Sequence, residues 1–191
     1  MNIQKIIQSS IETKQRILKD PLILKQIRET AAICIETFQA KGKLLLCGNG
    51  GSASDAQHIA AELSGRFEFD REPLFAEALH VNSSFMTAVA NDYSFDAVYS
   101  RMIKAAGRAG DVLIGISTSG NSANVVNAIK EAKTIGMHTI AFTGEQGGEL
   151  AAISDICLKV PSSNTARIQE SHIMIGHIIC GIVEQTLFSK P

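Results

Sequence analysis

Two short loops of small and polar residues, each directly after an apolar run, most constrain how this chain can fold. The first loop, Cys47–Asp55, follows residues 44–46, and the second, Ser117–Ser122, follows residues 112–116. Each loop precedes a segment whose apolar residues recur at helical spacing. In α/β folds, a loop between a strand end and a helix start presents backbone N–H groups and a positive helix end to an anion. The sequence therefore predicts two anion-binding loops on one sheet.

The side chains of these loops favour a phosphorylated ligand over a dinucleotide. Hydroxyl groups dominate the second loop, which suits a terminal phosphate monoester. The first loop formally satisfies the dinucleotide fingerprint G-x-G-x-x-A over Gly48–Ala53. However, that fingerprint needs an acidic residue at the end of the next strand, and residues 79–84 contain none. No Gly-Lys-[Ser/Thr] sequence follows either loop, so the Walker pattern is absent as well.

Short β-rich runs alternate with helical segments along most of the chain. This alternation predicts an α/β fold with a doubly wound parallel sheet of about five strands, flanked by helices and extended by N-terminal helices. The predicted strands are 43–47, 76–81, 112–117, 138–143 and 156–160. The predicted helices are 3–18, 22–40, 53–66, 84–90, 95–107, 121–135 and 165–188.

Composition narrows the class of protein. A net charge of −1 and an aromatic content of 5% without tryptophan disfavour a nucleic-acid binder. The 4 cysteines lack metal-finger spacing and are expected to be buried free thiols in a reducing cytosol. The N-terminus lacks a signal-peptide pattern, and no apolar run is expected to reach the ~18 residues of a membrane span. A length of 191 residues favours one domain.

The helices of this chain carry more apolar surface than one small sheet needs. The predicted helix 165–188 is apolar on more than one side, and the helices before residue 40 add further apolar positions. Association of several copies through helices is therefore expected.

Two predicted helices carry candidate acid–base and metal-ligand residues. His58 and Glu62 lie four residues apart and so share a helix face, while Gln169, Glu170 and His177 lie on the predicted last helix. A glutamate and a histidine that face one pocket suit proton transfer at neutral pH. His58, Glu62, Gln169 and His177 together also suit a divalent metal such as zinc. The alternative is a surface His–Glu ion pair and a hydrogen-bonded core histidine.

Four motifs in order resemble those of the phosphoheptose isomerases, which belong to the sugar-isomerase (SIS) family. They are Gly48–His58, Ala90–Asp92, Gly115–Val125 and Ala166–Glu170. The resemblance covers essentially the whole chain, as a single SIS domain over 1–191 that includes the helices of residues 1–40. It implies a bacterial cytoplasmic homotetramer with active sites at subunit interfaces, without nucleic-acid or membrane partners. Such enzymes convert sedoheptulose 7-phosphate to D-glycero-D-manno-heptose 7-phosphate for lipopolysaccharide biosynthesis.

The resemblance also implies roles for individual residues. Glu62 corresponds to the catalytic base and His177 to the second acid–base group. One zinc ion per subunit would be held by His58, Glu62, Gln169 and His177. The implied substrate-binding residues are Asn49, Gly50, Ser52, Arg66, Asn91, Asp92, Ser117, Thr118, Ser119, Ser122 and Gln169.

Two alternatives to this enzyme remain open from the sequence. One is a non-enzymatic SIS protein that binds the replication initiator, a branch in which residues unable to transfer a proton commonly replace Glu62 and His177. Both ionisable groups are present here, which favours the enzyme. The other is an isomerase or sensor of a different ketose phosphate, suggested by Asn82 where the family commonly has aspartate. Glu145–Gln146 also departs from the family pattern and is predicted to be a surface turn.

Overall fold

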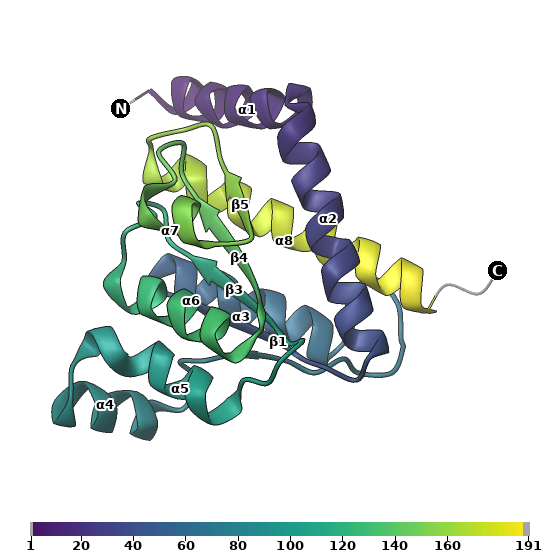
Figure 1. Ribbon diagram of the computed structural model, residues 1–191. Coiled ribbons are helices and arrows are strands. Elements are labelled where there is room, and N and C mark those ends of the chain that lie inside the picture. Colours follow the sequence, from purple (N-terminus) through teal and green to yellow (C-terminus); the bar gives the residue numbers. More distant parts are fainter. Residues whose placement is uncertain (1, 189–191) are drawn as a thin grey trace.

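A parallel five-stranded sheet forms the centre of the protein, as a computed structural model of the chain shows (Figure 1). The structure describes residues 2–188. The strands lie in the order β2-β1-β3-β4-β5, and every neighbouring pair is parallel. Their bounds are β1 Leu44–Gly48, β2 Ala76–Ala78, β3 Val112–Ile116, β4 His138–Thr143 and β5 Ile156–Lys159. The predicted doubly wound α/β fold is therefore confirmed.

Helices cover both faces of this sheet (Figure 1). Their bounds are α1 Ile3–Lys19, α2 Pro21–Gln39, α3 Gly51–Ser64, α4 Ser83–Asp92, α5 Val98–Ala106, α6 Ala123–Ile135, α7 Gly148–Ile153 and α8 Thr165–Phe188. One hydrophobic core joins α2, α3 and α8 to the sheet, and a second joins α5 and α6 to the opposite face.

Alternation along the strands explains how one sheet supports two cores. Successive side chains of a strand point to opposite faces. Leu44 and Leu46 accordingly lie in the core under α2, α3 and α8, whereas Leu45 and Cys47 lie in the other core. Because both faces are covered, β1 is apolar at every position before its final glycine, which is typical of parallel strands.

The strand order reverses between β1 and β3, which brings the two predicted anion-binding loops together. Connections from β1 lead outward to β2, whereas those from β3 lead the other way to β4 and β5. The last residue of β1, Gly48, lies opposite Ile116, the last residue of β3. In open α/β sheets, ligands bind at the carboxyl ends of the strands at this reversal.

The structure differs from the sequence-based elements at three places. The predicted strand 76–81 ends at Ala78, because residues 79–81 turn toward α4. The predicted helix 95–107 is divided into a 3₁₀ turn, Phe95–Ala97, and α5. Helix α7 was not expected; it has only 6 residues and begins at the second of two glycines with positive φ, Gly147 and Gly148, so the sequence carries little helical periodicity there.

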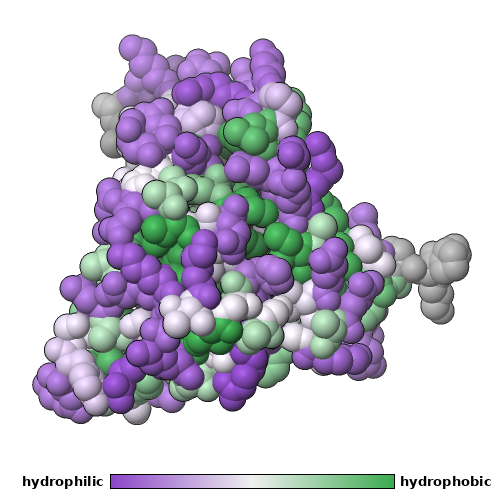
Figure 2. All heavy atoms as spheres, in the orientation of Figure 1, coloured by the Kyte–Doolittle hydropathy of each residue, from purple (hydrophilic) through white to green (hydrophobic). Residues whose placement is uncertain are grey.

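The N-terminal helices meet at a sharp corner. The carboxylate of Asp20 accepts hydrogen bonds from the first amides of α2, and Pro21 occupies the first helical position, where its missing N–H is no loss. Beyond this corner α1 leaves large apolar side chains exposed, namely Ile3, Ile6, Ile7, Ile11 and Leu18. Figure 2 shows hydrophobic atoms exposed on the visible face below α1, among mostly hydrophilic surroundings.

Helix α8 is the longest and among the most apolar helices of the described residues. Within residues 2–188, it is the one helix long and apolar enough to cross a membrane by length and composition. Its apolar character is an average over the helix; α8 contains no uninterrupted apolar run of about 18 residues, because polar residues such as Glu170, His177 and Glu184 interrupt it. In this fold, Ile168, Ile175 and Val183 of α8 are buried in the core shared with α2 and α3. All 4 cysteines are buried free thiols, as predicted.

Candidate active site

Hydroxyl groups of the second loop converge after β3. The hydroxyl of Ser117 lies 2.8 Å from that of Ser122 and 3.4 Å from that of Ser119. Ser122 precedes α6, yet its hydroxyl makes no capping hydrogen bond to the helix. The loop therefore offers side-chain hydroxyls next to the N-terminus of α6, where amides and the helix dipole favour an anion.

The segment of residues 144–150 holds the backbone of the hydroxyl loop in place. The backbone of Gly144 donates to the carbonyl of Thr118, and that of Leu150 donates to the carbonyl of Gly120. A Cβ on Gly120 would lie 2.0 Å from the carbonyl oxygen of Gly147, so no larger residue fits there. Glu145 and Gln146 are exposed in the adjoining turn, as predicted.

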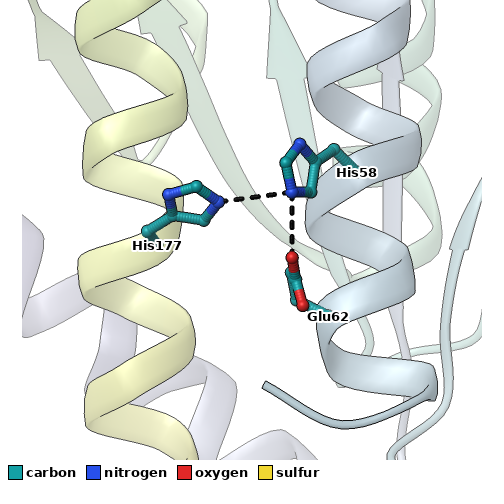
Figure 3. A group of neighbouring side chains, drawn as sticks. All are labelled: His58, Glu62 and His177. Carbon is teal, nitrogen blue, oxygen red and sulfur yellow. Dashed lines mark hydrogen bonds and ion pairs between the residues drawn. The ribbon is translucent and has the colours of Figure 1, made fainter. Parts of the chain in front are cut away.

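Three ionisable side chains meet between α3 and α8 (Figure 3). His58 Nε2 lies 2.8 Å from Glu62 Oε1 and 3.4 Å from His177 Nε2. The ligand atoms of all three residues lie within 4.8 Å of one another. The predicted helix-face pairing of His58 and Glu62 is thereby confirmed, and His177 lies beside it, partly exposed.

Close packing of the two helices explains why His177 reaches this cluster. Gly176 lies so near α3 that a Cβ there would be 2.5 Å from the side chain of Ile59. His177 directly follows Gly176, and His58 directly precedes Ile59, so this contact brings the two histidines together. Phe67 also stacks on the imidazole of His177, with ring centroids 5.5 Å apart and an interplanar angle of 25°.

A buried ion pair holds the segment that carries Phe67. The side chains of Arg71 and Glu184 are 2% and 0% exposed, with Nε and Oε1 3.0 Å apart. Glu184 also accepts hydrogen bonds from the backbone of Phe67 and Glu68. Arg71 donates to the carbonyls of Glu62 and Leu63 at the end of α3. This network therefore joins the end of α3 to α8, the helix that bears His177.

A carboxyl group beside this cluster is poorly solvated. Burial raises the pKa of Asp55 to about 6, and the nearby His58 opposes that shift. Oδ2 of Asp55 is buried and has no hydrogen-bond partner within residues 2–188.

The geometry of the three-residue cluster fits zinc. In a tetrahedral site with ligand atoms about 2.0–2.1 Å from the metal, neighbouring ligand atoms lie about 3.4 Å apart. The two histidine nitrogens have this separation of 3.4 Å, whereas Nε2 of His58 and Oε1 of Glu62 lie 2.8 Å apart and would have to move apart on metal binding. Two histidines and one glutamate also form a known catalytic ligand set, which leaves one position open for water or substrate.

Gln169 lies apart from this cluster. Its amide contacts Gly51 at the start of α3, 2.6 Å from where a Cβ on that glycine would lie. Gly51 precedes His58 by about two helical turns, or about 10 Å. Gln169 therefore lies near the first loop, where it can face a sugar, and its role as a fourth zinc ligand stays a prediction.

The remaining residues predicted to bind substrate differ in their position and exposure. Asn49 directly follows β1, Gly50 adopts a φ of +57°, which favours glycine, and Ser52 is buried in the first turn of α3. Arg66, Asn91 and Asp92 are exposed, and within residues 2–188 none of them contacts the cluster through a hydrogen bond or ion pair. Asn82 caps α4 by accepting from the amide of Phe85. This capping gives Asn82 a local structural role.

Sequence reasoning missed several residues that support the site. Phe67 and the Arg71–Glu184 pair carried no signal, because nothing in the sequence relates the segment after α3 to the end of α8. Asn124 lies within the motif Gly115–Val125 but was not assigned a role. In the structure, its side chain is buried and bonds to Asn49.

The fold and this site define a sugar-isomerase (SIS) domain protein. The SIS domain family model matches residues 7–144. The phosphoheptose isomerase of Clostridium acetobutylicum is 53% identical over 188 residues, which cover 98% of this chain and 96% of that protein. That of Aneurinibacillus thermoaerophilus is 50% identical, covering 97% of this chain and 94% of that protein.

Solved structures agree with these sequence relatives. The phosphoheptose isomerase of Neisseria gonorrhoeae superposes with a TM-score of 0.90 at 45% identity, covering 96% of this chain and 97% of that chain. That of Francisella tularensis gives a TM-score of 0.91 at 38% identity, covering 96% of each chain. The chain therefore belongs to the phosphoheptose isomerase family and is a sugar-phosphate isomerase enzyme.

Proposed function

We propose that this enzyme converts sedoheptulose 7-phosphate to D-glycero-D-manno-heptose 7-phosphate. The observation that carries the proposal is the His58–Glu62–His177 cluster, which lies in a fold that also presents a hydroxyl loop for phosphate. A non-enzymatic phosphosugar sensor needs the second feature but not the first. The names of the relatives at about 50% identity support the same substrate.

The isomerisation needs one proton moved between two carbons and another between two oxygens. Glu62 removes the proton from C1 of the ketose and later returns it to C2. His177 gives a proton to the oxygen on C2, which produces an enediol, and takes one from the oxygen on C1. All atoms of the sugar are retained, and the carbonyl moves from C2 to C1. General acid–base catalysis of this kind typically contributes about 10²–10⁴-fold to the rate.

The phosphate and the rest of the sugar are held by the two loops. Ser117, Thr118, Ser119 and Ser122 bind the phosphate, and the N-terminal amides of α6 add positive potential. Asn49, Gly50, Ser52 and Gln169 line the sugar, with Arg66, Asn91 and Asp92 at the rim. Hydrogen bonds to a charged oxygen are worth about 1.5–3 kcal/mol each, which makes a lysine unnecessary.

A zinc ion would be held by His58, Glu62 and His177, with Gln169 as a further candidate ligand. A zinc-bound Nε2 of His177 would carry no proton, so with zinc bound the proton exchanged by His177 would have to be the one on Nδ1. When bound, such an ion polarises a carbonyl or hydroxyl oxygen of the substrate. Glu62 can serve two roles because its two oxygens are distinct: Oε1 points to His58, and Oε2 is left for the proton. In the same proposal, the enzyme is a cytoplasmic homotetramer with active sites at subunit interfaces, and its product supplies heptose for lipopolysaccharide.

The test is incubation of the purified protein with sedoheptulose 7-phosphate, followed by NMR detection of the aldose. We expect aldose to accumulate to equilibrium, and the reverse reaction to start from the aldose. If neither sugar is converted with zinc added, the proposal is wrong. A parallel incubation with a six-carbon ketose 6-phosphate decides whether a shorter sugar is preferred.

The metal is tested separately from activity. Elemental analysis after purification without chelators should give about one zinc per subunit, and His58→Ala should lose it because the histidine nitrogen is removed. Zinc should also raise the melting temperature of the wild-type protein but not of His58→Ala. His138→Ala, which changes an exposed histidine, is the matched control. Equal zinc content in all three proteins would contradict the ligand assignment.

A further inference from the structure

A pair of asparagine amides joins the two loops of the site. Asn124 is 2% exposed and lies at the start of α6, directly after the hydroxyl loop. Asn49 lies in the first loop, directly after β1. Nδ2 of each residue lies 2.9 Å from Oδ1 of the other, so the two amides form a closed, reciprocal pair.

The backbone of Val125 settles which way both amides point. Its N–H lies 3.0 Å from Oδ1 of Asn124, and only an oxygen can accept that hydrogen bond. Nδ2 of Asn124 must therefore donate to Oδ1 of Asn49. The hydroxyl of Tyr99, which donates to the carbonyl of Gly48, lies 3.5 Å from the same oxygen.

This arrangement leaves Asn49 with one free hydrogen-bonding group of known polarity. Its oxygen accepts from Nδ2 of Asn124, and one N–H of its own Nδ2 donates to Oδ1 of Asn124. The second N–H has no partner within residues 2–188. Asn49 is only partly buried, so this N–H can donate to an oxygen of a ligand between the loops.

We propose that Asn124 is a positioning residue that holds the amide of Asn49 with an N–H, rather than its carbonyl, toward the sugar. This inference rests on the proposed function, because it requires a sugar between the two loops. Without Asn124, the amide of Asn49 can rotate and present either group. A phosphosugar whose phosphate is bound by the second loop would then lack a correctly oriented N–H donor to its sugar in the first loop.

A double-mutant cycle on kcat/KM tests whether Asn124 acts through Asn49. Asn49→Ala and Asn124→Ala should each lower kcat/KM about 10-fold, mainly through KM, because a hydrogen bond to bound sugar is lost. The double variant should also lose about 10-fold instead of about 100-fold, since Asn124 has nothing left to orient. Losses that multiply, or an unchanged kcat/KM in folded Asn124→Ala, would overturn the inference.

Two controls separate positioning from folding. Asn127→Ala changes another asparagine of α6, whose side chain donates to the carbonyl of Asp96, and should leave kcat/KM unchanged. Denaturant unfolding should show that Asn124→Ala remains folded under the assay conditions in both backgrounds. Its stability cost should be smaller in the Asn49→Ala background, because the two hydrogen bonds between the amides are already lost there. A wild-type protein that converts no sugar would instead contradict the proposed function, and this inference with it.

Discussion

His58, Glu62 and His177, the groups proposed to transfer protons and bind zinc, lie together for two different reasons. The spacing of His58 and Glu62 places them on one helix face without tertiary help. His177 comes from a helix more than a hundred residues later and meets them through the contact of Gly176 with Ile59. Single substitutions here should therefore change chemistry more than folding.

Glu62→Gln and His177→Gln should each lower kcat about 100-fold or more, which corresponds to about 2.7 kcal/mol. Each substitution keeps the size of the side chain or reduces it, but removes the group that carries the proton. Their combined effect should be less than multiplicative, because both serve one reaction. The measurement is steady-state kinetics with sedoheptulose 7-phosphate.

Glu68→Gln and His138→Gln are the matched controls for these variants, because both residues are exposed on the surface. They should keep wild-type kcat. Turnover by Glu62→Gln at a rate near that of the wild type would remove Glu62 from the mechanism.

His172 should make stability depend on pH. Burial lowers the pKa of this histidine from 6.5 to about 4, although its hydrogen bond to the carbonyl of Thr143 opposes the shift. The unfolded chain therefore binds the proton more readily, and stability present above pH 6.5 should be lost as pH falls toward about 4. The full loss is about 3 kcal/mol. Urea unfolding of His172→Phe should show a smaller loss over this range; an unchanged pH dependence would contradict the assignment.

At the level of helices and strands, local sequence patterns predicted most elements but not the contacts between them. The five strands and both loops follow from apolar runs that end in small residues. Helix α7 was missed because glycines precede so short a segment. The pairing of Asn49 with Asn124 and the stacking of Phe67 on His177 depend on tertiary packing, which periodicity cannot reveal.

The buried Arg71–Glu184 pair is a further contact that local patterns do not reveal. Replacing one partner alone should cost more stability than replacing both. Arg71→Met leaves the buried carboxylate of Glu184 without its cation, which typically costs about 3–5 kcal/mol. The double change to Arg71→Met and Glu184→Leu should recover only part of this loss, because six backbone groups bonded to these side chains lose their partners. Urea unfolding gives the comparison.

Lys104→Met is a suitable control for Arg71→Met, since Lys104 pairs with Glu131 while 64% exposed. It should change the free energy of unfolding by less than about 1 kcal/mol. Equal losses for the two variants would show that burial of the Arg71–Glu184 pair is unimportant.

For the whole molecule, the exposed apolar face of α1 is best explained by association of several copies. Ile3, Ile7 and Ile11 recur every fourth residue and so form one stripe, yet all three are exposed in the single chain. Exposed apolar patches of this kind mark interaction sites. The proposed tetramer provides a partner for that stripe.

Ile7→Glu combined with Ile11→Glu should therefore yield a smaller assembly, because two charges would be buried in the interface. Light scattering after size exclusion gives the mass of the species. Activity should fall as well, since the proposed active sites lie between subunits. Gln8→Glu adds a charge on the polar face of α1 and should leave the mass unchanged; an unchanged mass for the double variant would exclude α1 from the interface.

The contacts of the hydroxyl loop with residues 144–150 have a consequence for substrate selection. Gly120 and Gly147 are in close contact, and Gly144 and Leu150 donate to the backbone of the hydroxyl loop, so this loop has little room to move toward residues 144–150. The proton-transfer cluster is equally fixed, by the contact of Gly176 with Ile59. In the proposed mechanism, a phosphosugar would therefore have to span a nearly constant distance from its phosphate to its carbonyl. Chain length would then be selected by the spacing between two rigid ends, so that a sugar one carbon short binds its phosphate normally but does not reach the base.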